Sequence, residues 1–238
     1  MAIDHWLLDR CNQGVHPPTL RFYTWPPATV SLGYFQKQWP QAWRDIRWRN
    51  QPLTLVRRPT GGRAVLHHRD LTYAVVTHPE SRRRRQVYET ICEFLVLGWK
   101  RLGLEIHYGQ ARRGYHHQTN CFAMATGADL VVRDGTKFIG SAQAWRQATV
   151  LQHGSMALHL DPHLTRQVFP STAPLHVPWL RTAMGDPLPS IEEIVPSLQQ
   201  AAAECFAAQF EILPLQPPEW SSLKPYIQQA IPTNCFVS

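Results

Sequence analysis

The chain has 238 residues, of which 44% are hydrophobic, and its 24 basic and 17 acidic side chains give a formal charge of +7. This apolar content excludes an intrinsically disordered chain, and the length suits one large domain or a domain with a small appendage. No apolar run approaches the roughly 20 residues that span a bilayer. Because no basic-then-apolar leader opens the sequence, we expect a cytoplasmic protein that does not associate with membranes.

Four of the basic residues are lysines and twenty are arginines, so guanidinium groups carry most of the charge. Such an excess attracts an acidic partner. The one dense run, Arg82–Arg85, is either a binding surface or a solvated helix face. Because no DNA- or RNA-binding signature accompanies it, we expect acidic proteins rather than nucleic acid as partners, and we expect a monomer.

The first two thirds of the chain is dominated by short β-rich runs. We expect a short amphipathic helix over residues 1–12, helical spacing over 39–48, and strands over 20–25, 29–35, 53–57, 64–66 and 71–77. An apolar helical stripe runs from Val87 to Leu102 and ends at Gly103. The Asp134-Gly135 turn then predicts a hairpin with strands at 130–132 and 137–142, followed by a strand over 151–160.

The last third is helical, with predicted helices over residues 191–210 and 224–231 and proline-rich connectors near 170–190 and 214–218. Strands followed by helices indicate an α+β domain with a short helical C-terminal cap. We expect a catalytic core over residues 1–165 and a helical extension over 166–238 that packs on it.

The cysteines do not form a framework. They are odd in number and widely spaced, with no Cys-x-x-Cys pair, which argues against disulfides and against a structural zinc site. The histidines lack the spacing of a metal site, so we expect no bound metal. The cysteines are Cys11, Cys92, Cys121, Cys205 and Cys235.

Gly61 and Gly62 follow a predicted strand directly. Paired glycines let the backbone approach a ligand closely, and exposed N–H groups there can bind an acyl carbonyl or a phosphate. A plain turn is the commoner explanation for two such glycines. The pattern by itself leaves both interpretations open.

Two further segments carry reactive side chains. Lys137 begins the second hairpin strand, beside the small residues Gly140 and Ser141, and Cys121 lies in the polar loop that precedes the hairpin. A cysteine becomes a nucleophile where a neighbouring cation or base lowers its pKa, and Lys137 and His117 are the candidates. Without such a neighbour, Cys121 is an inert loop residue and Lys137 a surface lysine.

Six segments of the chain form a longer pattern, in order along the sequence: Met1–Asp4, Ser31–Gln36, Arg57–His67, Leu71–Tyr73, Lys137–Gln143 and Leu151–Ser155. Together they resemble the signature of the superfamily of lipoate–protein ligases, octanoyltransferases and biotin ligases. The resemblance covers about residues 1–165 and implies a mixed β-sheet core flanked by helices, of the biotin/lipoate ligase-like catalytic type.

Within this superfamily, the Gly61-Gly62-Arg63 loop is similar to that of the cysteine-dependent octanoyltransferases, whereas the ATP-dependent ligases usually carry three glycines there. The Cys121-Phe122 pair ahead of the lysine strand also resembles the transferase branch. One departure is His68, which stands where that branch commonly has an acidic residue.

The transferase branch implies a reaction in two steps. Octanoate is taken from acyl carrier protein as a thioester on Cys121, with Lys137 exchanging the proton, and is then passed to a lysine of a lipoyl domain or small lipoyl-carrier protein. Neither a metal nor another cofactor is implied. The implied substrate-binding residues are Arg58, Gly61, Gly62, Arg63, His67, Gly140, Ser141 and His153.

Two alternatives remain. An ATP-dependent lipoate or octanoate ligase would bind ATP and Mg²⁺ and would not need Cys121. A non-catalytic module that binds an acyl group or a carrier would need neither a thiol nor a titratable amine, so the presence of Cys121 and Lys137 argues against it.

Overall fold

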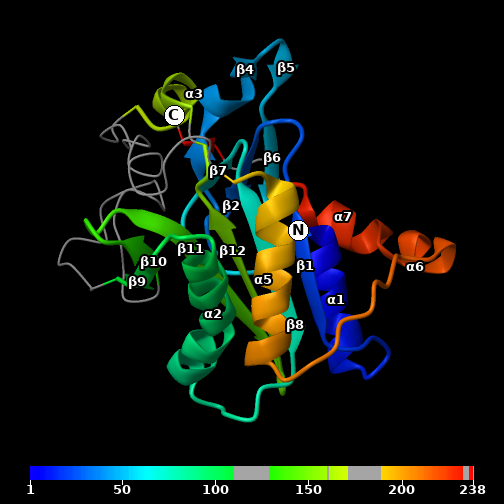
Figure 1. Cartoon of the computed structure of the whole chain (residues 1–238). Coiled ribbons are helices and arrows are strands. Elements are labelled where there is room, and N and C mark those ends of the chain that lie inside the picture. Colours follow the sequence, from blue (N-terminus) through cyan, green and yellow to red (C-terminus); the bar gives the residue numbers. More distant parts are fainter. Residues whose placement is uncertain (110–128, 160, 171–188, 233–235, 238) are drawn as a thin grey trace.

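The computed structural model describes residues 1–109, 129–159, 161–170, 189–232 and 236–237, with helices packed around a central sheet (Figure 1). Each neighbouring pair of strands in this six-stranded sheet is antiparallel. In order across the sheet, the strands are β1 (Thr19–Tyr23), β8 (Leu71–Thr77), β12 (Thr149–Met156), β11 (Lys137–Arg146), β10 (Asp129–Val132) and β9 (Ile106–Tyr108).

The two faces of the central sheet are covered by different helices. Successive side chains of a strand point to opposite faces, and in β8 Tyr73 and Val75 belong to the core beneath α2 (Arg84–Arg101) and α5 (Ile191–Cys205). Ala74 and Val76 pack instead with α1 (Ala2–Asn12). Figure 1 shows α2 and α5 side by side across the sheet.

A smaller sheet lies beside the central one and contains strands in both orientations. Its middle strand, β2 (Thr29–Leu32), is parallel to β6 (Thr54–Arg57) and antiparallel to β7 (Val65–His67). The core around it includes side chains of α3 (Pro162–Val168), a helix capped by Asp161. The predicted α+β class, with mixed β-structure flanked by helices, is confirmed.

Residues 39–48 do not form the helix that we expected. They form β3 (Trp39–Pro40), a 3₁₀ turn over Gln41–Arg44, and the first strand of a small hairpin, β4 (Arg47–Trp48) with β5 (Gln51–Pro52). The four-residue spacing of the tryptophans has another cause, because Trp43 is buried and its indole N–H donates to the Val168 carbonyl at 2.8 Å. Tertiary packing explains their spacing.

The C-terminal helices pack on both sides of the domain. Helix α5 is part of the main core, whereas α6 (Pro217–Ser222) and α7 (Lys224–Ala230) lie near α1. The hydroxyl of Tyr226 in α7 donates a hydrogen bond to the Asp9 carboxylate in α1. The short β13 (Phe236–Val237) pairs with β3. The division at residue 165 stays a prediction. In the described ranges, no helix has both the length and the apolar character needed to cross a bilayer.

Helices α2 and α5 make a close contact that depends on Gly98. A methyl group at this position would lie 2.7 Å from Leu198 Cδ2 and 3.1 Å from Leu198 Cα. We predict that Gly98→Val lowers the free energy of unfolding by about 1–3 kcal/mol, because the added atoms overpack the interface. Urea unfolding measures the effect. Lys100→Ala, at an exposed position of the same helix, is the control, and an equal change in the two variants contradicts the prediction.

Candidate active site

A cavity of about 300 Å³ lies where the small sheet and the glycine loop meet strands β8, β11 and β12. Most of the predicted site residues line it: Arg58, Gly61, Gly62, His67, Lys137, Gly140, Ser141 and His153. Arg63 is not in its lining, but the Arg63 carbonyl accepts a hydrogen bond from Arg58 at 2.6 Å. Cys121 lies outside the described residues. The catalytic and binding roles of these residues stay predictions.

Lys137 is paired with Asp129 in the wall of this cavity. Lys137 Nζ lies 2.9 Å from Asp129 Oδ1, and the two side chains are only 3% and 5% exposed. Withdrawing two charges from water costs several kcal/mol per ion, which their mutual attraction must offset. The amine is therefore held at one place by its carboxylate, and a surface position for Lys137 is ruled out.

Gly140 makes room for this ion pair. It faces Asp129 across the β10–β11 pairing, and a Cβ at residue 140 would lie 2.8 Å from Lys137 Cε and 3.0 Å from Lys137 Nζ. Real Cβ atoms essentially never approach other heavy atoms more closely than about 3 Å. The space left by the missing side chain of Gly140 is therefore filled by the Lys137 side chain.

The glycine loop is held from within by Arg58. This buried guanidinium donates to the carbonyls of Gly61 at 2.9 Å and Ser31 at 2.8 Å, and also to the Arg63 carbonyl. Hydrogen bonds to charged groups contribute more than neutral ones. Arg58 therefore fixes the loop onto β2, and its role in substrate binding stays a prediction.

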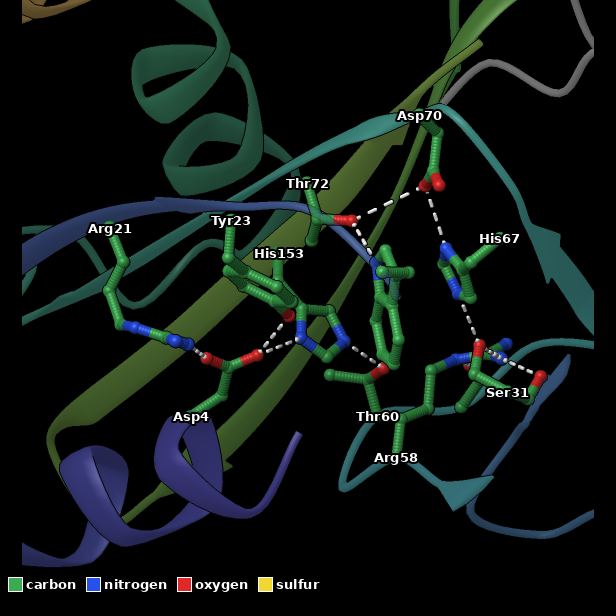
Figure 2. Close-up of polar contacts among 12 residues, drawn as sticks. Asp4, Arg21, Tyr23, Ser31, Arg58, Thr60, His67, Asp70, Thr72 and His153 are labelled. Carbon is green, nitrogen blue, oxygen red and sulfur yellow. Dashed lines mark hydrogen bonds and ion pairs between the residues drawn. The ribbon is translucent and has the colours of Figure 1, made fainter. Parts of the chain in front are cut away.

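His67 sits in a line of hydrogen bonds that joins the two sheets (Figure 2). Its Nδ1 lies 2.7 Å from Asp70 Oδ2, and its Nε2 lies 2.8 Å from Ser31 Oγ. The ring also stacks on Trp25, with 4.1 Å between the centroids. Because the Asp70 carboxylate only accepts, Nδ1 of a neutral His67 carries the proton and Ser31 donates to Nε2. Both nitrogens are engaged, so His67 positions the wall of the cavity.

His153 forms a second line, from α1 to the glycine loop (Figure 2). Its Nδ1 lies 3.1 Å from Asp4 Oδ2 and its Nε2 lies 2.6 Å from Thr60 Oγ1. Asp4 also accepts from Arg21 and from the Tyr23 hydroxyl. Burial alone would raise the pKa of Asp4, but the N-terminal ammonium, His153 and Arg21 together lower it.

Burial lowers the pKa of His153, and the neighbouring Asp4 acts in the opposite direction. A neutral His153 donates from Nδ1 to the Asp4 carboxylate and accepts from the Thr60 hydroxyl. This side chain consequently holds the Thr60 end of the loop in place and does not supply a free proton to the cavity.

The described cysteines are poor nucleophiles. Cys92 lies on the buried face of α2, and burial raises its pKa to about 12. Burial also raises the pKa of Cys11 and of Cys205. The thiolate is the reactive form of cysteine, so these three side chains are suited to packing rather than to nucleophilic attack.

The family comparison agrees with this geometry. The model of the lipoyl protein ligase A/B catalytic domain matches residues 1–203, a span that contains every predicted site residue. The chain belongs to this lipoyl protein ligase A/B family. The superfamily resemblance seen in the sequence is thereby confirmed, and the match extends past residue 165 into α5.

Curated relatives in this family carry a transferase name. An octanoyltransferase LipM of Lysinibacillus sphaericus is 40% identical over 71% of this chain and 64% of its own length. An octanoyltransferase LipM of Kyrpidia tusciae is 36% identical over 89% of this chain and 84% of its own length. The chain thus spans less than two thirds of the first of these relatives.

Solved structures show the same fold. A lipoate-protein ligase A bound with ATP is 24% identical, with a TM-score of 0.73 over 96% of this chain and 88% of the other. A bi-partite lipoate protein ligase of Thermoplasma acidophilum, solved in a study that includes its E2 lipoyl domain, is 22% identical with a TM-score of 0.69 over 95% and 87%. At these identities, the likeness concerns the fold of the family.

Sequence reasoning missed several residues that shape this family member's site. Asp129, Asp4 and Asp70 pair with Lys137, His153 and His67. A signal existed for Asp129, because the Asp134-Gly135 turn fixes a hairpin in which Asp129 comes opposite Gly140. No comparable local signal links Asp4 to His153, because their contact depends on how α1 packs on the sheet.

We predict that Asp129→Asn lowers the free energy of unfolding by about 3 kcal/mol or more, because it leaves the buried Lys137 ammonium without its anion. The control is Glu204→Gln, which breaks the more exposed pair with Arg101 and should cost about 1 kcal/mol or less. Urea unfolding compares the two variants. Equal losses would show that the buried pair is no more important than the surface pair.

The lowered pKa of His153 predicts a pH dependence of stability. Below about pH 6.5 the unfolded chain takes up a proton on this side chain that the folded chain does not. The contribution of His153 to the free energy of unfolding is therefore fully present above about pH 6.5 and is lost as the pH falls. In His153→Asn the decline between pH 6.5 and 5.5 should be shallower, by at most about 1.4 kcal/mol per pH unit.

Urea unfolding at a series of pH values measures this slope, and His163→Asn, at an exposed position of α3, is the control. A slope in His153→Asn that equals that of the unsubstituted protein would contradict the assignment of this proton to His153.

Proposed function

We propose that this chain is an octanoyltransferase of lipoate biosynthesis. It takes octanoate from acyl carrier protein, holds it as a thioester on Cys121, and passes it to a lysine of a lipoyl-carrier protein. The observation that carries this proposal is the buried Lys137–Asp129 pair in a cavity bordered by the glycine loop. The octanoyltransferase names of relatives that are 36% to 40% identical support it.

The first step exchanges one thioester for another. The Cys121 sulfur attacks the carbonyl carbon of the octanoyl group, a C–S bond forms, and the carrier leaves as its thiol. The leaving sulfur has to gain a proton and the Cys121 thiol has to lose one. In this proposal the Lys137 ammonium donates a proton to the leaving sulfur and, as the neutral amine, takes the proton of the Cys121 thiol. An amine can make this exchange, whereas a guanidinium does not release a proton in proteins.

The second step forms an amide. The acceptor lysine attacks the Cys121 thioester as a neutral amine, the C–S bond breaks, and the proton lost by nitrogen returns to the Cys121 side through Lys137. Because the donor is already a thioester, the reaction as proposed needs neither ATP nor Mg²⁺.

Backbone N–H groups are the proposed stabilisers of the oxyanion. Gly140 and Ser141 lie within the paired strand β11, where backbone groups serve the sheet. Gly61 and Gly62 lie in a loop that Arg58 holds rigidly at the cavity wall. We therefore assign the oxyanion to the glycine loop, where each donor typically contributes about 3 kcal/mol to the transition state.

The cavity is suited to a medium-length acyl chain. Its volume of about 300 Å³ is at the small end of ligand pockets. Each buried methylene contributes about 0.8 kcal/mol, so the chain supplies affinity without a charged anchor.

Intact mass after incubation with octanoyl-acyl carrier protein tests the proposal. The protein should gain one octanoyl group, and Cys121→Ala should gain none, because burial raises the pKa of the described thiols of Cys11, Cys92 and Cys205. Cys92→Ser is the matched control and should load like the unsubstituted protein. No adduct on the unsubstituted protein, or a stable adduct on Cys121→Ala, would overturn the assignment.

A further inference from the structure

The loop that follows β2 presents two aromatic side chains to solvent. Tyr34 is 53% exposed and Phe35 is 80% exposed, and their rings meet edge to face with 5.0 Å between the centroids. Single exposed apolar residues are common on protein surfaces. This aromatic pair is distinguished by how firmly the loop is held and by where it lies.

The loop is anchored by Arg57 from the neighbouring strand β6. The Arg57 guanidinium donates to the carbonyls of Gly33 at 2.9 Å, Tyr34 at 3.3 Å and Gln36 at 2.7 Å. The Tyr34 N–H donates in turn to the Thr60 carbonyl at 2.8 Å. These bonds fix the backbone on both sides of Phe35. The loop that carries the aromatic pair therefore loses little backbone conformational entropy when a partner binds.

The aromatic pair lies next to the glycine loop. Gly33 packs so closely on the glycine loop that a Cβ would lie 1.8 Å from the Gly62 carbonyl oxygen. A Cβ on Gly61 would lie 4.0 Å from Phe35 Cδ2. Since Gly61 and Gly62 line the cavity, Phe35 stands next to the loop to which we assign the oxyanion.

The lengths of the two substrate arms indicate which partner touches this position. The acceptor offers a lysine, whose four-carbon stem is short, so the surface of the acceptor protein must come up to the cavity. The donor carrier presents its thioester on a much longer flexible arm and can remain farther away. The exposed Lys37 beside the pair favours an acidic border on the partner.

We propose that Tyr34 and Phe35 are the docking point for the acceptor, a small lipoyl-carrier protein with an apolar patch and an acidic rim beside its target lysine. The choice of acceptor rests on the proposed octanoyl transfer. Aromatic residues on a rigid support commonly supply most of the binding energy of an interface, and Phe35 is the more exposed of the two.

Direct binding of the carrier tests docking independently of catalysis. Calorimetric titration of the full chain with an unmodified lipoyl-carrier protein should show a Kd at least tenfold higher for Phe35→Ser. Phe35→Trp, which keeps an aromatic ring, should bind within threefold of the unsubstituted protein. The control is Ile212→Ser, since Ile212 is 88% exposed and lines a different pocket, together with residues such as Pro17 and Gln199; its Kd should change less than twofold.

Transfer assays then separate docking from chemistry. With the octanoyl enzyme preloaded from a small thioester, Phe35→Ser should lose at least tenfold in kcat/KM toward the carrier protein and keep its rate with Nα-acetyl-lysine amide within twofold. Equal losses with both acceptors, a Kd unchanged in Phe35→Ser, or a loss confined to loading from acyl carrier protein would overturn the proposal. Phe35-dependent binding without any transfer would refute the octanoyltransferase assignment and leave the docking surface standing.

Discussion

The site depends on one constraint, which is that a lysine amine must be kept inside a protein at a fixed point. Lys137 meets it through a carboxylate 2.9 Å away on the adjacent strand. The absence of a side chain at Gly140 provides the space for both groups. An isolated charge there would be very costly, so the pair and the glycine have to be present together, and the hairpin register that aligns them is part of the site.

The wall opposite this pair is built by hydrogen bonds that join elements distant in the sequence. Arg58 ties the glycine loop to β2, His67 connects Ser31 to Asp70, and His153 connects α1 to Thr60. Each of these side chains uses its polar atoms on the protein itself. The residues that touch substrate in the proposed reaction are therefore few, whereas the residues that position them are many.

The sequence was informative where a local pattern determines the structure. Strand β8 follows from its β-rich composition and the hairpin around Asp134-Gly135 from turn chemistry, and the glycine loop and Lys137 were found from motifs. It failed where packing decides. The spacing of Trp39 and Trp43 resembles that of a helix, but these residues lie in β3 and a 3₁₀ turn. The hydrogen bonds of Arg58 depend on carbonyls that only the folded loop brings together.

The central claim is that Lys137 enables acyl transfer to Cys121, and its most direct test is the rate of thioester formation on that residue. Peptide mapping after rapid mixing with octanoyl-acyl carrier protein should locate the octanoyl group on Cys121. The rate should fall at least a hundredfold when Lys137→Met is combined with Asp129→Asn, which removes both buried charges and so preserves the fold. An octanoyl group on another residue, or an unchanged rate in the folded double variant, would contradict the claim.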